Sequence, residues 1–486
     1  MKSLLIGASS AVFLTAAPAL ALTPAEFVEE LKALYEAQGM NFELGEQETD
    51  GEAEVLRDFG STIEDKNGLT TSFSVGEMRV APTSDEGYEV VVTFPPEVQI
   101  VSTSSVDDET VEMAFTIASD GRYLVRRAGD FLEGLSEFTS LTVTLDSLEG
   151  GDDVPSMDLS VDVTDLVGTA SYSLEEDIQK FDYTIGAMGY SVKIDDPEAE
   201  MDMSGTYADM TAKGEFGISN SSDPEAFLRT DEMRTMELVA ASSDFSVDSN
   251  TPQGPFSISG KTGETALSFS FGKGQIAYST YGDDVALQVD GGAIPFPVKA
   301  TMARLESSMA MPLVPTGEPG EMAVSLAMAD VEVDESLWGM FDPGQSLPRE
   351  PATIELDVTS KASALHSLMD EDAMTAGQMP WEFEDVQLRN LRVSIAGAEI
   401  TGQGSAVMNN AGPVPMPVGG IDLSIRGVNG LVGSLTEMGL LAPEQAMPVQ
   451  MMLGMFAKPG SEPDTFTSRV EMTEEGGILA NGIPLQ

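Results

Sequence analysis

Residues 158–164 read DLSVDVT, and this short stretch decides the fold class. Its apolar residues, Leu159, Val161 and Val163, alternate with aspartate, serine and threonine. Successive side chains of a β-strand point to opposite faces, so the alternation predicts a strand with one apolar face and one wet face. A strand of that kind is typical of antiparallel sheet.

The same alternation returns along most of the chain. It is clearest in residues 90–94, 111–117, 267–271, 285–289, 324–328, 354–358 and 421–425. The pairs that favour turns between such runs are Asp120-Gly121, Gly150-Gly151, Gly282-Asp283 and Gly291-Gly292. The sequence therefore predicts a mainly β protein, built as one long antiparallel meander. Its apolar face must be protected, and three arrangements stay open: a half-pipe, a barrel or stacked sheets.

Helical patterns occur only at the two ends of this β body, which is predicted over residues 41–427. Thr23, Pro24 and Glu26 form a capping box with proline in the first turn, which predicts an N-terminal amphipathic helix within residues 22–40. Residues 428–486 are predicted to hold a helical pair, over 428–438 and 447–457, followed by closing strands.

The first 21 residues have the order of a secretory signal peptide. A positive charge at Lys2 precedes an apolar run over residues 4–14, and Ala19 and Ala21 supply the small residues of a cleavage site. Cleavage is predicted between Ala21 and Leu22, which makes the protein periplasmic. No later run reaches the roughly 18 apolar residues that a membrane helix needs, so the mature chain is predicted to have no stable membrane anchor.

The net charge and the cysteine content indicate which partners are excluded and what stabilises the fold. The net charge is −57, and loss of Lys2 with the signal makes it one unit more negative. Such a chain repels nucleic acid and anionic lipid surfaces, so no nucleic-acid partner is expected. There is no cysteine, so burial of apolar surface must hold the fold together, and 42% hydrophobic residues suffice for that.

Two features suggest a phosphate-binding or metal-binding site, and neither supports one on closer inspection. Residues 254–262 read GPFSISGKT, which resembles a phosphate loop, but five residues rather than four separate the glycines. The alternation of serines with Phe256 and Ile258 predicts a strand instead. His366 is the only histidine, and without cysteine or a second histidine it cannot assemble the usual zinc sites. The protein is therefore predicted to be no enzyme and to use no cofactor.

Adjacent acids occur at residues 107–109, at Asp195-Asp196 and at Asp283-Asp284. None of them has the alternate spacing, central glycine and terminal glutamate of a calcium loop. We therefore expect solvated turns between strands, with weak cation sites as the alternative.

The most unusual local feature is the segment from Met447 to Ala457. Its apolar residues leave almost no polar face, so a surface helix is disfavoured and burial in the core is the first prediction. The alternatives are a lid over a lipid-accepting groove and a surface for a partner, since methionine adapts to variable ligands. In either alternative the candidate apolar binding surface consists of Met447, Met451, Met452, Met455 and Phe456.

Several segments resemble a known family. They are LWGMFDPGQSLPREPA at 337–352, GLLAPEQ at 439–445, MMLG at 451–454 and GIPL at 482–485. These segments are similar to an uncharacterised family of exported alphaproteobacterial proteins, a domain of unknown function. That resemblance implies no catalytic residues. More distantly, the strand-rich body with its short closing helices resembles AsmA-like envelope proteins, whose half-pipe sheets are thought to carry lipids.

Two functional hypotheses follow. The first is a periplasmic binding or scaffolding protein without catalysis, whose apolar sheet face accepts lipid or another component of the cell envelope. The second is a structural or protein-interaction module of the envelope that has no ligand. A lipid that co-purifies in a fixed ratio distinguishes the first from the second.

Overall fold

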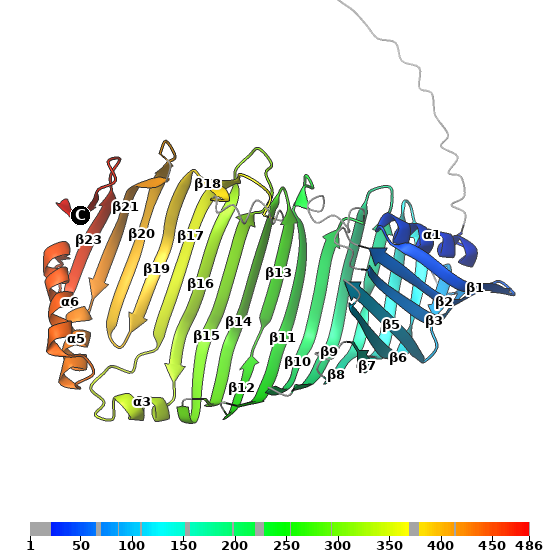
Figure 1. Cartoon of the computed structure of the whole chain (residues 1–486), viewed down its shortest axis with the longest axis horizontal. Helices are drawn as coiled ribbons and strands as arrows, with labels where there is room; N and C mark the ends of the chain where they lie inside the picture. The colour runs from blue at the N-terminus through cyan, green and yellow to red at the C-terminus, as the bar shows by residue number, and fades with distance from the viewer. Residues whose placement is uncertain are drawn as a thin grey trace, which may run out of the picture.

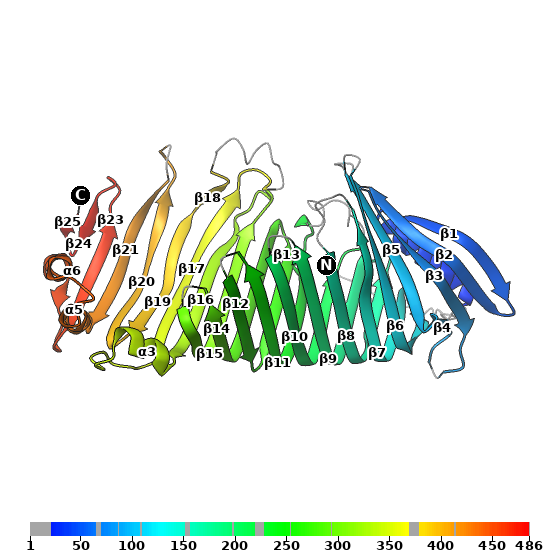
Figure 2. The ribbon, with the colours of Figure 1, turned by 60° about the horizontal axis from the view of Figure 1, so that its bottom comes forward.

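The computed structural model describes residues 21–64, 70–85, 87–106, 109–150, 156–196, 199–218, 228–252, 254–292, 294–368, 379–412 and 415–485. Its 25 strands form one antiparallel sheet, in which most strands pair with their neighbours in sequence (Figure 1). The predicted meander is confirmed. The first strands and the last strands lie at opposite ends of the sheet, which is therefore open, as in the half-pipe arrangement (Figure 2).

Among the described residues, the N-terminal part of the sheet carries one helix. Its elements are α1 (Pro24–Ala37), β1 (Asn41–Asp50), β2 (Ala53–Glu64), β3 (Thr70–Pro82), β4 (Val90–Thr93), β5 (Glu97–Val106), β6 (Glu109–Ala128) and β7 (Phe131–Glu149). β4 and β5 both lie between β3 and β6, so together they occupy one position in the sheet.

α1 covers the apolar face of the sheet at this end. The predicted capping box is formed, because the Thr23 hydroxyl accepts the backbone N–H of Glu26 while the Glu26 carboxylate accepts that of Thr23. Leu22, Phe27 and Val28 are buried against side chains of β2 to β7. The buried partners in this core are Leu56, Phe59, Val75, Met78, Val80, Val90, Val92, Val98, Val125 and Leu132.

The central part of the sheet contains nine strands of the described chain. They are β8 (Ser156–Ser173), β9 (Ile178–Asp196), β10 (Ala199–Phe216), β11 (Arg234–Thr251), β12 (Gly254–Thr262), β13 (Thr265–Gly272), β14 (Gln275–Gly291), β15 (Ile294–Pro312) and β16 (Gly320–Val333). The segment that resembles a phosphate loop is strand β12, as predicted. β12 and β13 together occupy one position between β11 and β14.

The C-terminal part contains three of the helices that the described residues define. Its elements are α3 (Glu335–Phe341), β17 (Ala352–Ala364), β18 (Trp381–Phe383), β19 (Asp385–Ile395), β20 (Ala398–Asn409), β21 (Met416–Arg426), α5 (Val428–Glu437), α6 (Pro443–Phe456), β22 (Lys458–Pro459), β23 (Thr465–Met472), β24 (Ile478–Ala480) and β25 (Ile483–Pro484). The predicted helical pair and closing strands are confirmed. The second helix begins earlier than predicted, at Pro443, because proline suits the first turn of a helix.

Two of the predicted turns are wrong. Asp120-Gly121 lies inside β6, where the ladder with β7 shifts its register. Gly282-Asp283 lies inside β14, so the acid pair Asp283-Asp284 is in a strand rather than in a solvated turn. Asp195-Asp196 ends β9, and residues 107–108 lie outside the described residues. Asp120-Gly121 and Gly282-Asp283 therefore mark irregularities within long strands rather than strand ends.

A row of aspartates with left-handed backbone crosses the sheet. Its members, with φ between 48° and 52°, are Asp165 in β8, Asp209 in β10, Asp284 in β14 and Asp330 in β16. The register places Gly186 of β9 between the first two and Ala303 of β15 between the last two. Aspartate adopts this conformation more readily than most residues, because its short polar side chain can hydrogen-bond locally.

These aspartates explain why the apolar alternation advances by three residues within some strands. In β2, Leu56 and Phe59 flank Asp58, whose φ is 49°, and both are buried in the single core beneath α1. In an unbroken strand they would lie on opposite faces. β10 makes the same step of three, from Tyr207 to Met210 around Asp209. The left-handed residue thus lets both halves of a long strand turn their apolar side chains to one face.

Candidate functional site

The C-terminal half of the sheet has an apolar face that no described helix crosses; α3, α5 and α6 lie at its margins (Figure 1). Cross-strand pairing from β15 to β21 places its side chains next to one another on the same side. We call this surface the open apolar face. Its residues are Leu305, Met309, Val324, Leu326, Met328, Ile354, Leu356, Val358, Leu391, Val393, Ile400, Leu423 and Ile425.

The side chains of the open apolar face remain accessible. Val324 is 48% exposed, Ile354 40% and Leu326 36%, whereas Leu56 in the core beneath α1 is 0% exposed. Six neighbouring strands at about 4.8 Å spacing make this face about 24 Å wide. Contiguous exposed apolar patches of this order mark places where a protein meets a ligand, a partner or a membrane.

The opposite face of the same strands is polar and carries ion pairs. Arg304 contacts Asp283 at 2.7 Å and Glu306 at 2.8 Å. Hydrogen bonds to these two carboxylates raise the pKa of Arg304 above its ordinary value, with Glu306 the larger cause. Arg392 and Arg426 share Glu399 at 3.1 and 2.7 Å. Exposed ion pairs add little stability, so we interpret this face as the solvated side of the sheet.

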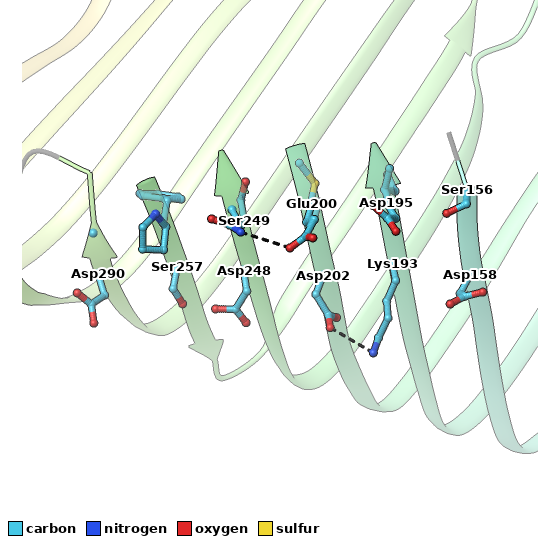
Figure 3. Close-up of a pocket in the computed structure, with 16 residues that line it drawn as sticks. Ser156, Asp158, Lys193, Asp195, Glu200, Asp202, Asp248, Ser249, Ser257 and Asp290 are labelled. Carbon is cyan, nitrogen blue, oxygen red and sulfur yellow. Dashed lines mark hydrogen bonds and ion pairs between the residues drawn. The ribbon is translucent and has the colours of Figure 1, made fainter. Parts of the chain in front are cut away.

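The polar face also contains an acidic hollow, near the strand ends of β8 to β12 and β14 (Figure 3). Asp158, Asp202, Asp248 and Asp290 line it, and Lys193 is the one cation among its lining residues, 3.5 Å from Asp202. No group of three or more potential metal-binding side chains occurs within the described ranges. Asp202 and Asp248 stand directly opposite each other, which is unfavourable for like charges. The hollow therefore contributes a negative potential to this face.

The candidate surface predicted from the methionine-rich segment lies on α6, and the prediction that it forms core is wrong. Met447 is 66% exposed, Met451 59%, Met452 58% and Met455 50%. Ala446 is the buried residue of this helix. The physical reason is position: α6 packs on α5 at the end of the sheet, where no further layer of the described chain covers it (Figure 1).

The C-terminal end of α6 is fixed to the sheet by hydrogen bonds. The carbonyl oxygen of Phe456 accepts one from the Ser468 hydroxyl at 2.7 Å and one from the Asn481 amide at 2.8 Å. Ser468 belongs to β23, and Asn481 follows β24 directly. The exposed methionines are thus held at a fixed place beside the last strands of the sheet.

The predicted cleavage site lies at the edge of the described residues. Ala19 is outside them, Ala21 is exposed, and Leu22 is 3% exposed within the core beneath α1. Sequence reasoning gave an apolar sheet face as the lipid-accepting surface in its first hypothesis, but it did not identify the strands or residues that form this face. The alternation of residues 324–328 and 354–358 predicted its strands correctly, but it carried no sign that nothing would pack over them.

The fold and the site define a protein with a single-layer antiparallel sheet, one uncovered apolar face, and helices at both ends. The chain belongs to the bacterial family described as "Uncharacterized protein conserved in bacteria (DUF2125)", whose model matches residues 225–485. That match includes the open apolar face and α6. No curated protein and no solved structure matches the chain. Within the described ranges, every helix is too short or too polar to cross a membrane.

Proposed function

We propose that this protein binds lipid in the periplasm without catalysis, and that the open apolar face accepts the acyl chains. The observation that supports the proposal most is the accessibility of that face. Val324, Leu326 and Ile354 are each exposed by more than a third, on strands whose other face is solvated. An apolar surface of this kind is unfavourable in water unless something apolar covers it.

The dimensions suit an acyl chain. The hydrocarbon core of a bilayer is roughly 30 Å thick, so the chains of one leaflet occupy roughly 15 Å. The open apolar face is about 24 Å wide across its six strands. A chain can therefore lie across several strands and cover apolar residues from each of them, such as Leu326, Leu356 and Leu391.

The location in the envelope rests on the N-terminal segment and on the family resemblance. Residues 1–21 have the composition of a cleavable signal, and cleavage there leaves Leu22 as the first residue, which packs into the core. The similarity to exported alphaproteobacterial proteins agrees with this location. The likeness to AsmA-like half-pipe proteins favours lipid as the ligand.

A structural or protein-interaction module is the second candidate, and the exposed methionines of α6 favour it. The two candidates differ in what purifies with the protein. Native mass spectrometry of the mature chain, purified without detergent, should show a bound lipid in a fixed ratio under the proposal. A protein without lipid that also takes up no fatty acid, and that retains a protein partner in a pull-down, would favour the module instead.

A further inference from the structure

α6 is apolar around more than half of its circumference. At 3.6 residues per turn, its exposed apolar side chains are spread over an arc of roughly 200°. They are Met447, Val449, Met451, Met452 and Met455. The buried Ala446 lies outside this arc. A helix that packs on one protein surface presents an apolar stripe of about 100°, so the wider arc fits surroundings that are apolar on several sides at once.

α6 is also nearly free of charge in a very acidic protein. Residues 438–457 contain one acid, Glu444, and no lysine or arginine, whereas the whole chain has a net charge of −57. The helix at the other end of the sheet differs, because the apolar residues Phe27 and Val28 of α1 are 5% and 2% exposed. Of these two helices, α6 at the C-terminal end of the sheet therefore presents apolar side chains to the outside, whereas α1 buries Phe27 and Val28.

α6 adjoins the open apolar face through α5. α5 contacts both α6 and β20, and its Val432 is buried. β20 contributes Ile400 to the open apolar face, and its neighbour β21 contributes Leu423 and Ile425. The apolar surface of the helix and that of the sheet therefore lie at the same end of the molecule (Figure 1).

We infer that α6 is the element through which this protein contacts a lipid bilayer, at the end of the sheet where lipid reaches the open apolar face. This inference rests on the proposed function. The 14 residues of α6 give a helix of about 21 Å, too short to span the roughly 30 Å hydrocarbon core, so α6 lies in the plane of the interface.

The charge pattern specifies the kind of membrane. Interfacial helices that bind anionic lipids carry lysine and arginine on their polar face, and α6 has none. The net charge of the chain repels an anionic surface. Binding therefore requires lipids without net charge, and anionic lipids weaken it in a way that added salt reverses.

Flotation with phosphatidylcholine vesicles tests the inference. The variant combines Met451→Glu and Met455→Glu, both at exposed positions, where glutamate is a good helix former. The matched control is Val407→Glu, because Val407 is 67% exposed and lies in β20 on the solvated side of the sheet. The parent and the control should float with the vesicles. The double variant should lose about tenfold or more of the floating fraction, because charged side chains in hydrocarbon are costly.

With vesicles that contain phosphatidylglycerol, a smaller fraction of the parent protein should float at low salt than at high salt. Flotation of the double variant equal to that of the parent would overturn the inference, and so would a parent that does not float. A parent that does not float and instead forms a dimer, which the same substitutions abolish, would assign α6 to a second copy of the chain.

Uptake of fatty acid from two sources separates this inference from the proposed function. From a cyclodextrin complex, the parent and the double variant should load equally, because the open apolar face is intact in both. From vesicles, the double variant should load more slowly. A parent that loads from neither source contradicts the proposed function. If the parent loads, and the double variant loads from vesicles as fast as the parent, only the inference about α6 is contradicted.

Discussion

Polar substitution in the middle of the open apolar face tests its role quantitatively. The triple variant Val324→Thr, Leu326→Gln and Ile354→Thr changes side chains that are 48%, 36% and 40% exposed. Full burial of such a side chain is worth about 1.5–3 kcal/mol, so covering the exposed part of each contributes about 0.5–1.4 kcal/mol. The three changes should together weaken the binding of a fatty acid by about 1.9–3.7 kcal/mol, or roughly 20- to 500-fold.

Fluorescence titration with a dye-labelled fatty acid measures this loss, and urea unfolding measures stability in parallel. Because surface substitutions usually change stability little and threonine suits a strand, the free energy of unfolding should fall by less than about 1.5 kcal/mol. The matched control is Val167→Thr with Val407→Thr, which makes the same chemical change at exposed positions outside the open apolar face. If the triple variant binds the fatty acid as tightly as the parent, this face is not the lipid site.

Other consequences of the structure can be measured separately. Asp209→Val should lower the free energy of unfolding by about 1–2 kcal/mol, because a β-branched residue disfavours the left-handed backbone. Asp209→Asn should change it by less than about 0.5 kcal/mol. Equal urea midpoints for the two variants would contradict the role of the left-handed aspartates. In the same assay, Met452→Ala should lower the free energy of unfolding by less than about 0.5 kcal/mol and Leu56→Ala by about 2–5 kcal/mol. The reverse order would show that α6 is part of the core. The Asp342 carboxylate accepts hydrogen bonds from the backbone N–H groups of Leu347 and Ser346, and these bonds lower its pKa. The ionised carboxylate therefore stabilises the folded protein above the ordinary carboxyl pKa, and this contribution is lost as the pH falls through the lowered pKa. The melting temperatures of Asp342→Asn and the parent should accordingly differ at about pH 7 and converge as the pH falls below the ordinary carboxyl pKa, and a constant difference would contradict this. Lysine at both Ala19 and Ala21 should leave an uncleaved precursor in the membrane fraction, whereas a periplasmic protein that still begins at Leu22 would refute the signal assignment.

Local patterns predicted the elements of this fold but not their lengths. The alternation around Val161 and the capping box at Thr23 depend on side chains close in sequence, and the structure confirms both. Gly282-Asp283 has the composition of a turn, yet it lies within a 17-residue strand. Whether such a pair ends a strand or bends it depends on pairing with the neighbouring strands, which a local pattern does not contain.

Burial was harder to predict than secondary structure. The composition of Met447 to Phe456 predicted an apolar helix correctly, and its burial incorrectly. The alternation at Val324 and Leu326 likewise predicted a strand without showing that its apolar face stays open. Burial depends on whether another layer of the chain reaches the surface. In the C-terminal half, the described helices α3, α5 and α6 lie at the margins of the sheet rather than across it (Figure 2).

The most direct test of lipid binding on the open apolar face compares two adjacent residues that point to opposite faces of β16. Leu326 points to the open apolar face, whereas the Ser325 hydroxyl lies 2.7 Å from that of Ser308 on the polar face. A photoreactive phenylalanine analogue at each position, followed by illumination with bound lipid and mass spectrometry, measures contact with the lipid. We predict a lipid adduct from position 326 and none from position 325. Equal adducts from both positions, or an adduct from position 325 alone, would contradict binding on the open apolar face.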